Sequence, residues 1–303
     1  MVQQELVEEY AEHRTHLIGV AYRLTGSVTD AEDAVQEAWL RLSKVDASQI
    51  HQLRGWLTTV VARICLDALR SATHRRERYV GSWLPEPVVT PLSGSVPEDP
   101  LDQVVRDEGV RMAAMVVLDR LTPEQRVAFV LHDAFSVPYT EIAATLGCSE
   151  PAARQHASRG RRAVADAPPP PRAALDEQRG VLERLLAAFA AGDTDRVVSL
   201  LHPDVVLVGD SDGKARTAAH EMAGADKVVR FLVGLYRHYP PHALGEARLV
   251  LVNGELGVAL PEVPGGDGEW TLSRRVTAFT IRDGRVAAIY DVVNPDKLSH
   301  IVF

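Results

Sequence analysis

Apolar residues recur at helical spacing through about the first 80 residues of the chain. One such stripe consists of Ala31, Ala34, Val35, Ala38, Trp39 and Leu42. It predicts an amphipathic helix, with Thr29 or Asp30 as the capping residue and carboxylates in the first turn, where the helix dipole favours negative charge. A second helix is expected from about Leu53 to Thr73. Residues 1–80 therefore predict a helical domain.

The periodicity stops in residues 81–107, where prolines and Gly-Ser breaks mark a connector. Within it, "SWLPEPV" carries a tryptophan and a leucine that are costly to expose to water, so we expect a packed strap rather than a free linker. Helical periodicity returns over residues 108–167. The four prolines that follow in "APPPPRAA" predict a stiff spacer over residues 168–175.

The last block, residues 176–303, has a different pattern. It opens with the helical stretch "QRGVLERLLAAFAAGD" and then alternates β-rich segments with turns. One segment, "IRDGRV", contains the Asp-Gly pair expected in a tight hairpin. Helices combined with a strand-rich remainder predict an α+β domain with a curved sheet. The chain is thus expected to be multidomain, with two all-α domains followed by an α+β domain.

The stretch from Thr140 to Arg162, "TEIAATLGCSEPAARQHASRGRR", predicts two short helices joined by a sharp turn at Gly147. We expect Thr140 to cap the first helix and Ser149 the second. This order is typical of a helix-turn-helix, whose second helix enters the DNA major groove. The residues expected to contact DNA are Ser149, Glu150, Arg154, Gln155, His156, Arg159, Arg161 and Arg162. A helical hairpin with a basic solvated face is the alternative.

The composition limits how this chain can bind DNA. Its net charge is −8, so DNA binding has to come from local basic patches. No run of eighteen apolar residues predicts a membrane span, and the charged helical start does not resemble a signal peptide. The two cysteines lack partners at metal-ligand spacing. We therefore expect a cytoplasmic protein with no metal, cofactor or catalytic residue.

Three segments, "AYRLTGSVTDAEDAVQEAWLRL", "RGWLTTVVARICLDALRSATHRRE" and the segment from "LTPEQR" through the helix-turn-helix, occur in this order. Together they resemble regions 2 and 4 of bacterial sigma-70-family initiation factors, in the compact extracytoplasmic-function (ECF) group. In that family the first segment binds the clamp helices of RNA polymerase. The second melts and reads the promoter −10 element, and the helix-turn-helix reads the −35 element.

The resemblance implies roles for two sets of residues. The polymerase-binding set is Asp30, Glu32, Asp33, Gln36 and Glu37, an acidic face that repels DNA but can pair with a basic protein surface. The −10-binding set is Arg54, Arg63, Arg70, Arg75 and Arg76, which can follow the phosphates of a separated strand. The family places its pocket for an unstacked base in the loop from about Lys44 to Arg54.

The segments "LLHPDVVLVGDSDGKA" and "VVNPDKL" resemble the SnoaL-like (NTF2-like) domain fused to the sigma-J type of ECF sigma factors. In that subgroup the first motif commonly reads Asp-Gly-Gly-Gly-Lys, so this chain differs at Ser211 and Asp212. "NPDKL" matches in full, and "SWLPEPV" resembles the linker motif. The resemblance implies a cone-shaped regulatory domain, with no separate anti-sigma factor required. The expected intramolecular contact comprises Trp83, Leu84, Pro85, Asp210, Lys214, Asn294, Pro295, Asp296, Lys297 and Leu298.

We interpret the chain as a promoter-specificity subunit whose partners are core RNA polymerase and promoter DNA. Two alternatives stay open. A one-component helix-turn-helix regulator with a ligand-sensing tail would bind duplex DNA alone, but it leaves the acidic face unexplained. A factor with an isomerase-like or cyclase-like tail needs a pocket acid or base with a shifted pKa, which the sequence does not show. A small-molecule ligand of the C-terminal domain also stays open.

Overall fold

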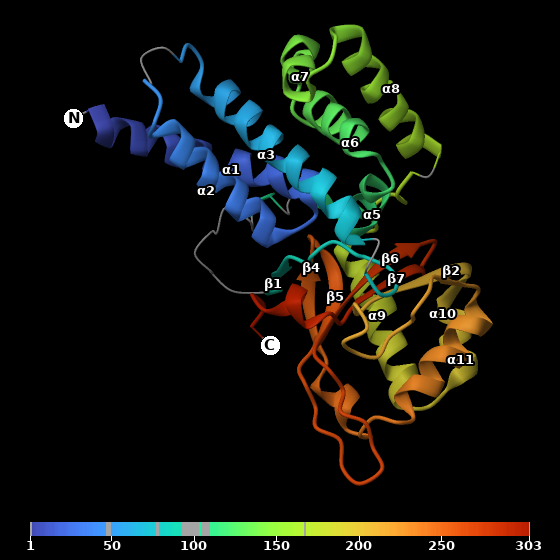
Figure 1. Ribbon diagram of the computed structural model, residues 1–303. Coiled ribbons are helices and arrows are strands. Elements are labelled where there is room, and N and C mark those ends of the chain that lie inside the picture. The colour runs from blue at the N-terminus through green and yellow to red at the C-terminus, as the bar shows by residue number, and fades with distance from the viewer. Residues whose placement is uncertain are drawn as a thin grey trace. The chain divides into compact units, whose positions relative to one another are not determined.

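The computed structural model describes residues 2–46, 50–76, 79–92, 103–104, 110–166 and 168–302. The chain divides into two compact units (Figure 1). The first, here called the helical unit, consists of Met1–Glu77, Val96–Val110 and Ala114–Pro169. The second, here called the sheet unit, consists of Arg78–Ser95, Arg111–Ala113 and Pro170–Phe303. The described residues 81–92 of the connector therefore belong to the sheet unit.

The N-terminal part of the helical unit contains three helices, α1 (Val2–Thr25), α2 (Val28–Leu42) and α3 (Leu53–Arg76). The predicted stripe of α2 is buried except for Trp39, which is half-buried with its ring 4.8 Å from that of Tyr10. The expected capping residues were wrong. Ser27 caps α2, since its hydroxyl accepts a hydrogen bond from the Asp30 amide at 3.0 Å, and Thr29 and Asp30 lie inside the first turn.

The C-terminal part of the helical unit contains α5 (Met112–Asp119) from Ala114 onward, α6 (Pro123–Phe129), a π-helical turn (Val130–Ala134), α7 (Tyr139–Leu146) and α8 (Glu150–Asp166). Thr122 caps α6 in a reciprocal capping box with Gln125. The Arg126 side chain is buried and donates to the Arg23 carbonyl oxygen at 3.0 Å and to Asp119 at 3.2 Å. The first bond joins α6 to the end of α1, and the second joins it to the last residue of α5.

The sheet unit contains a seven-stranded mixed sheet in the order β1-β4-β5-β6-β7-β2-β3. Its strands are β1 (Val89–Thr90), β2 (Leu201–Asp210), β3 (Met222–Ala223), β4 (Arg248–Val252), β5 (Glu255–Leu260), β6 (Arg275–Arg282) and β7 (Arg285–Val292). The β2–β7 pair is parallel, and the other neighbouring pairs are antiparallel. Together with the helical unit, this sheet confirms the predicted fold class.

Helices α9 (Leu175–Ala190), α10 (Thr194–Leu200) and α11 (Ala225–Tyr236) pack on the sheet around one hydrophobic core (Figure 1). Two short 3-10 turns, Ala243–Glu246 and Pro295–Leu298, complete the unit. The predicted Asp-Gly hairpin is confirmed, because Asp283 and Gly284 have φ values of 52° and 67° between β6 and β7.

The connector contributes a strand to this sheet. Val89 and Thr90 form β1, which pairs with β4 in the register Val89↔Val252, so that β4 is not the edge strand of the sheet. This pairing satisfies backbone groups that an edge strand would otherwise expose. Among the described residues, no helix is long and apolar enough to cross a membrane, and Cys65 and Cys148 are both unpaired thiols.

Candidate functional site

The acidic residues of α2 lie on the face opposite its buried stripe. Glu32, Asp33 and Gln36 are exposed, whereas Asp30 and Glu37 are both half-buried. Glu37 forms an ion pair with Arg41 at 2.9 Å, one helical turn away. Carboxylates therefore remain at the surface of α2, as the sequence pattern predicts for a protein-binding face.

The arginines of α3 contact the helix-turn-helix part of the same unit. Arg63 donates to the carbonyl oxygen of Ala144 in α7 at 2.9 Å, and Arg70 forms an ion pair with Glu124 in α6 at 3.0 Å. Both arginines are largely exposed, so these bonds are weak and can exchange for other acceptors. Arg54 is also exposed and lies 3.1 Å from His16. The predicted side-chain roles of Arg75 and Arg76, and residues 47–49 of the expected pocket loop, fall outside the described residues.

The helix-turn-helix consists of α7 and α8. Gly147 has the left-handed conformation, with φ of 68°, that the sharp turn requires. The predicted cap at Thr140 was wrong, because Pro138 occupies the N-cap of α7 and Thr140 lies in the first turn. Ser149 is at the start of α8, where its hydroxyl accepts from the Ala152 amide at 3.4 Å.

Helix α8 buries small residues, Ala153, Ala157 and Gly160, and presents its polar residues on the other side. The exposed set is Ser149, Arg154, Gln155, Arg159, Arg161 and Arg162, and Glu150 and His156 are half-buried. Arg154 pairs with Glu150 at 2.6 Å and Arg161 pairs with Asp133 at 2.8 Å. Hydrogen bonding to Asp133 raises the pKa of Arg161. The predicted DNA-contacting residues therefore all lie outside the buried face of α8.

A buried charge pair holds the connector to the sheet unit. We call residues 79–90 the strap. The Asp210 carboxylate, at the end of β2, is completely buried. It accepts hydrogen bonds from the Leu84 amide at 2.6 Å, from the Lys297 ammonium at 2.6 Å and from the Tyr79 hydroxyl. The charge of Asp210 is therefore compensated by two groups of the strap and by one group of the "NPDKL" segment.

Lys297 completes the network from the opposite side. Its ammonium also donates to the carbonyl oxygen of Leu84, and it lies 4.0 Å from the centre of the Trp83 ring. Asn294 donates to the Tyr79 hydroxyl at 2.8 Å. Burial and the negative charge of Asp210 raise the pKa of Tyr79, so its hydroxyl stays protonated and donates.

Two further strap contacts involve residues outside the predicted set for the intramolecular contact. Asn253, in the β4–β5 turn, exchanges hydrogen bonds with Val88, one at 3.0 Å and one at 2.8 Å. Asp212 accepts from the Val80 amide at 3.2 Å, which lowers the pKa of Asp212. Asp212 has φ of 49° where the subgroup motif has glycine, a conformation that aspartate tolerates better than most residues. The side chain of Asp212 therefore contributes a strap contact that glycine could not make.

The residues of the predicted intramolecular contact fall into a buried group and an exposed group in the structure. Trp83, Leu84, Asp210, Asn294 and Lys297 lie together in the buried network. Buried Pro85 and Leu298 flank it. Lys214 lies at the exposed margin, where it pairs with Asp296 at 2.5 Å and Asp212 at 3.1 Å, and Pro295 is exposed. No pattern in the sequence identified Tyr79, whereas the Asn253-Gly254 pair is a turn signal that could have marked its position.

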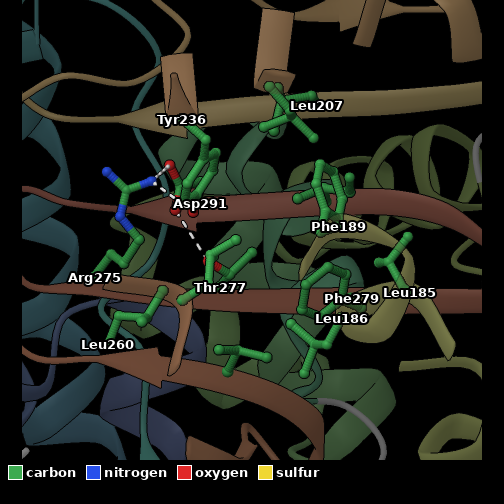
Figure 2. A pocket seen from close by; sticks show the side chains of 14 residues that line it. Leu185, Leu186, Phe189, Leu207, Tyr236, Leu260, Arg275, Thr277, Phe279 and Asp291 are labelled. Atoms are coloured by element: carbon green, nitrogen blue, oxygen red, sulfur yellow. Dashed lines mark hydrogen bonds and ion pairs between the residues drawn. The ribbon is translucent and has the colours of Figure 1, made fainter. Parts of the chain in front are cut away.

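A cavity lies inside the sheet unit, and Figure 2 shows its lining. The centre of a water molecule can occupy about 60 Å³ of it. Most of the lining is leucine and phenylalanine from α9 and the strands, such as Leu185, Phe189, Leu207 and Phe279. Polar groups occur at one end only, where Tyr236, Arg275, Thr277 and Asp291 lie close together (Figure 2).

Three family models match the chain. Sigma-70 region 2 matches residues 10–75, Sigma-70, region 4 matches residues 111–164, and the SnoaL-like domain matches residues 182–289. The first two matches fall on the helical blocks that carry the acidic face, the α3 arginines and the helix-turn-helix. The third falls on the sheet unit and covers the residues that line its cavity except Asp291.

The chain is similar to known proteins over nearly its full length. The ECF RNA polymerase sigma factor SigJ of Mycobacterium tuberculosis (strain ATCC 25618 / H37Rv) is 57% identical over 97% of this chain and 93% of its own. The probable ECF RNA polymerase sigma factor SigI of Mycobacterium tuberculosis (strain CDC 1551 / Oshkosh) is 32% identical over 94% of this chain and 92% of its own.

The crystal structure of the SigJ protein of Mycobacterium tuberculosis superposes with a TM-score of 0.81 at 54% identity, over 97% of this chain and 98% of that one. Sigma factors are non-enzymatic initiation factors, so the factor-enzyme alternative is set aside. Because the identity extends across both sigma regions and the C-terminal domain, the chain belongs to the ECF sigma factors of RNA polymerase, with a SnoaL-like domain after sigma-70 regions 2 and 4.

Proposed function

We propose that this sigma factor binds core RNA polymerase through the acidic face of α2 and reads promoter DNA through α3 and α8. The surface position of Glu32, Asp33 and Gln36 supports the first assignment. The exposed basic surface of α8 supports −35 recognition, with Arg159 and Arg162 available to phosphates. Arg54, Arg63 and Arg70 would follow the −10 strand, and Arg63 and Arg70 would first release their partners in α7 and α6.

A polymerase pull-down tests the protein-binding surface. Reversing the charge at one exposed position, Asp33→Arg, is expected to abolish retention of the intact chain by core polymerase. The matched control is Glu183→Arg, which makes the same change at an exposed position of α9. Retention of the Asp33→Arg variant at the level of the control would contradict the assignment. Tight duplex binding without polymerase would instead support the one-component regulator.

The proposal extends to the C-terminal domain, which modulates promoter use through the strap. The observation that carries it is the buried Asp210–Lys297 pair, both members of which hydrogen-bond to Leu84 of the strap, between sigma regions 2 and 4. A docked strap leaves fewer residues of the connector to span the two regions, and each residue of extended chain spans at most about 3.5 Å. The domain would thus limit how far the regions separate on a promoter, with no separate anti-sigma factor required.

In vitro transcription with core polymerase tests this regulatory role. Lys297→Met removes the buried ammonium and is expected to change promoter output relative to the intact chain, whereas Lys227→Met removes an exposed ammonium of α11 and serves as the control. Equal output from the three proteins, with the strap shown to be released in the Lys297→Met variant, would contradict regulation through the strap.

A further inference from the structure

The buried guanidinium of Arg275 is poorly supplied with acceptors. Its side chain is 2% exposed. It reaches Asp291, the Tyr236 hydroxyl and the carbonyl oxygen of Arg216 only at 3.4, 3.4 and 3.3 Å. Charge-assisted hydrogen bonds of this kind are normally about 2.7–2.9 Å long. Among the described residues, Arg275 Nε has no hydrogen-bond partner.

Asp291, in contrast, is well supplied with donors. Its carboxylate accepts from the hydroxyl of Thr217 at 2.6 Å and from that of Thr277 at 3.0 Å. Both carboxylate oxygens of Asp291 therefore have close donors, whereas the acceptors of Arg275 lie at 3.3–3.4 Å. Among the described residues that line this end of the cavity, Arg275 Nε is a buried donor without a partner.

Tyr236 adds a second donor beside the guanidinium. Its oxygen accepts from Arg275 (Figure 2), which leaves its own proton for another acceptor. Burial raises the pKa of Tyr236, which keeps this proton on the oxygen near neutral pH. A ligand atom placed here would meet two kinds of donor.

Charge balance decides between a neutral and an anionic acceptor. Arg275 and Asp291 already neutralise each other at 3.4 Å in a buried position. A ligand carboxylate would bring a third buried charge next to Asp291, and burying an uncompensated charge is costly. A neutral carbonyl oxygen satisfies the same donors without that cost.

We propose that this cavity binds a neutral, largely apolar molecule whose single carbonyl-type acceptor receives hydrogen bonds from Tyr236 and Arg275. Water centres can occupy about 60 Å³ of the cavity. If that space is treated as a sphere and its radius is increased by the ~1.4 Å radius of a water molecule, the cavity has a volume of roughly 230 Å³, equal to about eight liquid waters. The ligand is thus the size of a small aromatic ketone or aldehyde. The leucine and phenylalanine lining accommodates its ring. This assignment does not rest on the regulatory role of the domain.

Three compounds of nearly equal shape separate the contributions of the two ends of the cavity. Acetophenone carries a neutral acceptor, ethylbenzene carries none, and benzoate carries a negative charge. Dissociation constants for the intact chain are measured by titration followed by ligand-observed NMR. We expect acetophenone to bind roughly fivefold more tightly than ethylbenzene, the gain of about one hydrogen bond, and more tightly than benzoate.

Tyr236→Phe removes one donor and is expected to weaken acetophenone binding roughly fivefold while leaving ethylbenzene binding unchanged. The control, Tyr290→Phe, makes the same change one residue before Asp291 on β7, where strand alternation points the side chain to the other face of the sheet. It should leave both compounds unaffected. Near-UV circular dichroism confirms that each variant is folded.

Three outcomes with the unmodified chain would overturn the proposal. Tightest binding of benzoate would mean that the site takes anions. Equal binding of acetophenone and ethylbenzene would mean that the polar end contributes nothing. No detectable binding of any compound at millimolar concentration would mean that the cavity is a packing void. None of these outcomes bears on polymerase binding or on promoter output.

Discussion

Replacing Lys297 by methionine is expected to release the strap from the sheet unit. Methionine keeps most of the volume of the lysine side chain but removes the ammonium that lies 2.6 Å from the buried Asp210 carboxylate. Asp210 would keep only the Tyr79 hydroxyl and the Leu84 amide as donors. Removing one partner of a buried ion pair costs about 3–5 kcal/mol, because the other charge is left uncompensated.

Amide hydrogen exchange measures the resulting loss of stability in the strap itself. The Leu84 and Val88 amides donate to Asp210 and to Asn253, so their exchange reports opening of the strap at two separate contacts. A loss of about 3 kcal/mol corresponds to exchange that is roughly 150-fold faster. Lys227→Met, on the exposed surface of α11, should leave both amides unaffected.

A double-mutant cycle separates the ion pair from general loss of packing. Asp210→Asn together with Lys297→Met removes both charges, so the double variant should protect the strap better than Lys297→Met alone. The coupling free energy is expected at about 2 kcal/mol or more. Less than fivefold faster exchange at Leu84 in Lys297→Met, with no coupling in the cycle, would refute the reasoning that the pair holds the strap.

Three further predictions concern stability. Burial lowers the pKa of His16 from 6.5 to about 4, so its neutral form supports folding fully above pH 6.5 and this contribution is lost as the pH falls to about 4. The loss by pH 4 is about 3 kcal/mol for a fully buried group and roughly half that for this half-buried ring. Denaturant unfolding at pH 7.5 and at pH 4 measures it, and His16→Gln should flatten the dependence. Gly160→Ala places a Cβ atom 2.9 Å from Phe129 Cβ and should lower the free energy of unfolding by about 1–3 kcal/mol. Gly180→Ala brings its Cβ near no backbone atom and should raise the free energy of unfolding by about 0.5–1 kcal/mol. Thermal unfolding measures both, and equal effects would contradict the packing argument. Thr122→Ala should cost about 1 kcal/mol through the lost cap, and Thr122→Ser should restore most of it; an unchanged melting temperature for Thr122→Ala would show that the cap is dispensable.

Features set by neighbouring residues could be predicted from the sequence. The α2 stripe, the left-handed turn at Gly147 and the Asp283-Gly284 hairpin each follow from the spacing or the backbone preference of a few consecutive residues. The acidic face of α2 and the basic surface of α8 follow in the same way, because helical periodicity places them opposite buried residues. The N-caps at Thr29 and Thr140 failed, because Ser27 and Pro138 start those helices earlier.

The contacts that join distant segments were decided by the tertiary structure. Asp210 meets Tyr79 across 131 residues of sequence, and Asn253 meets Val88 across 165. The polar end of the cavity likewise brings Tyr236 of α11 to Arg275 of β6 and Asp291 of β7. A polar side chain looks the same in sequence whether it is solvated or buried beside a partner. Only the fold decides this, because it determines which donor removes the cost of taking that side chain out of water.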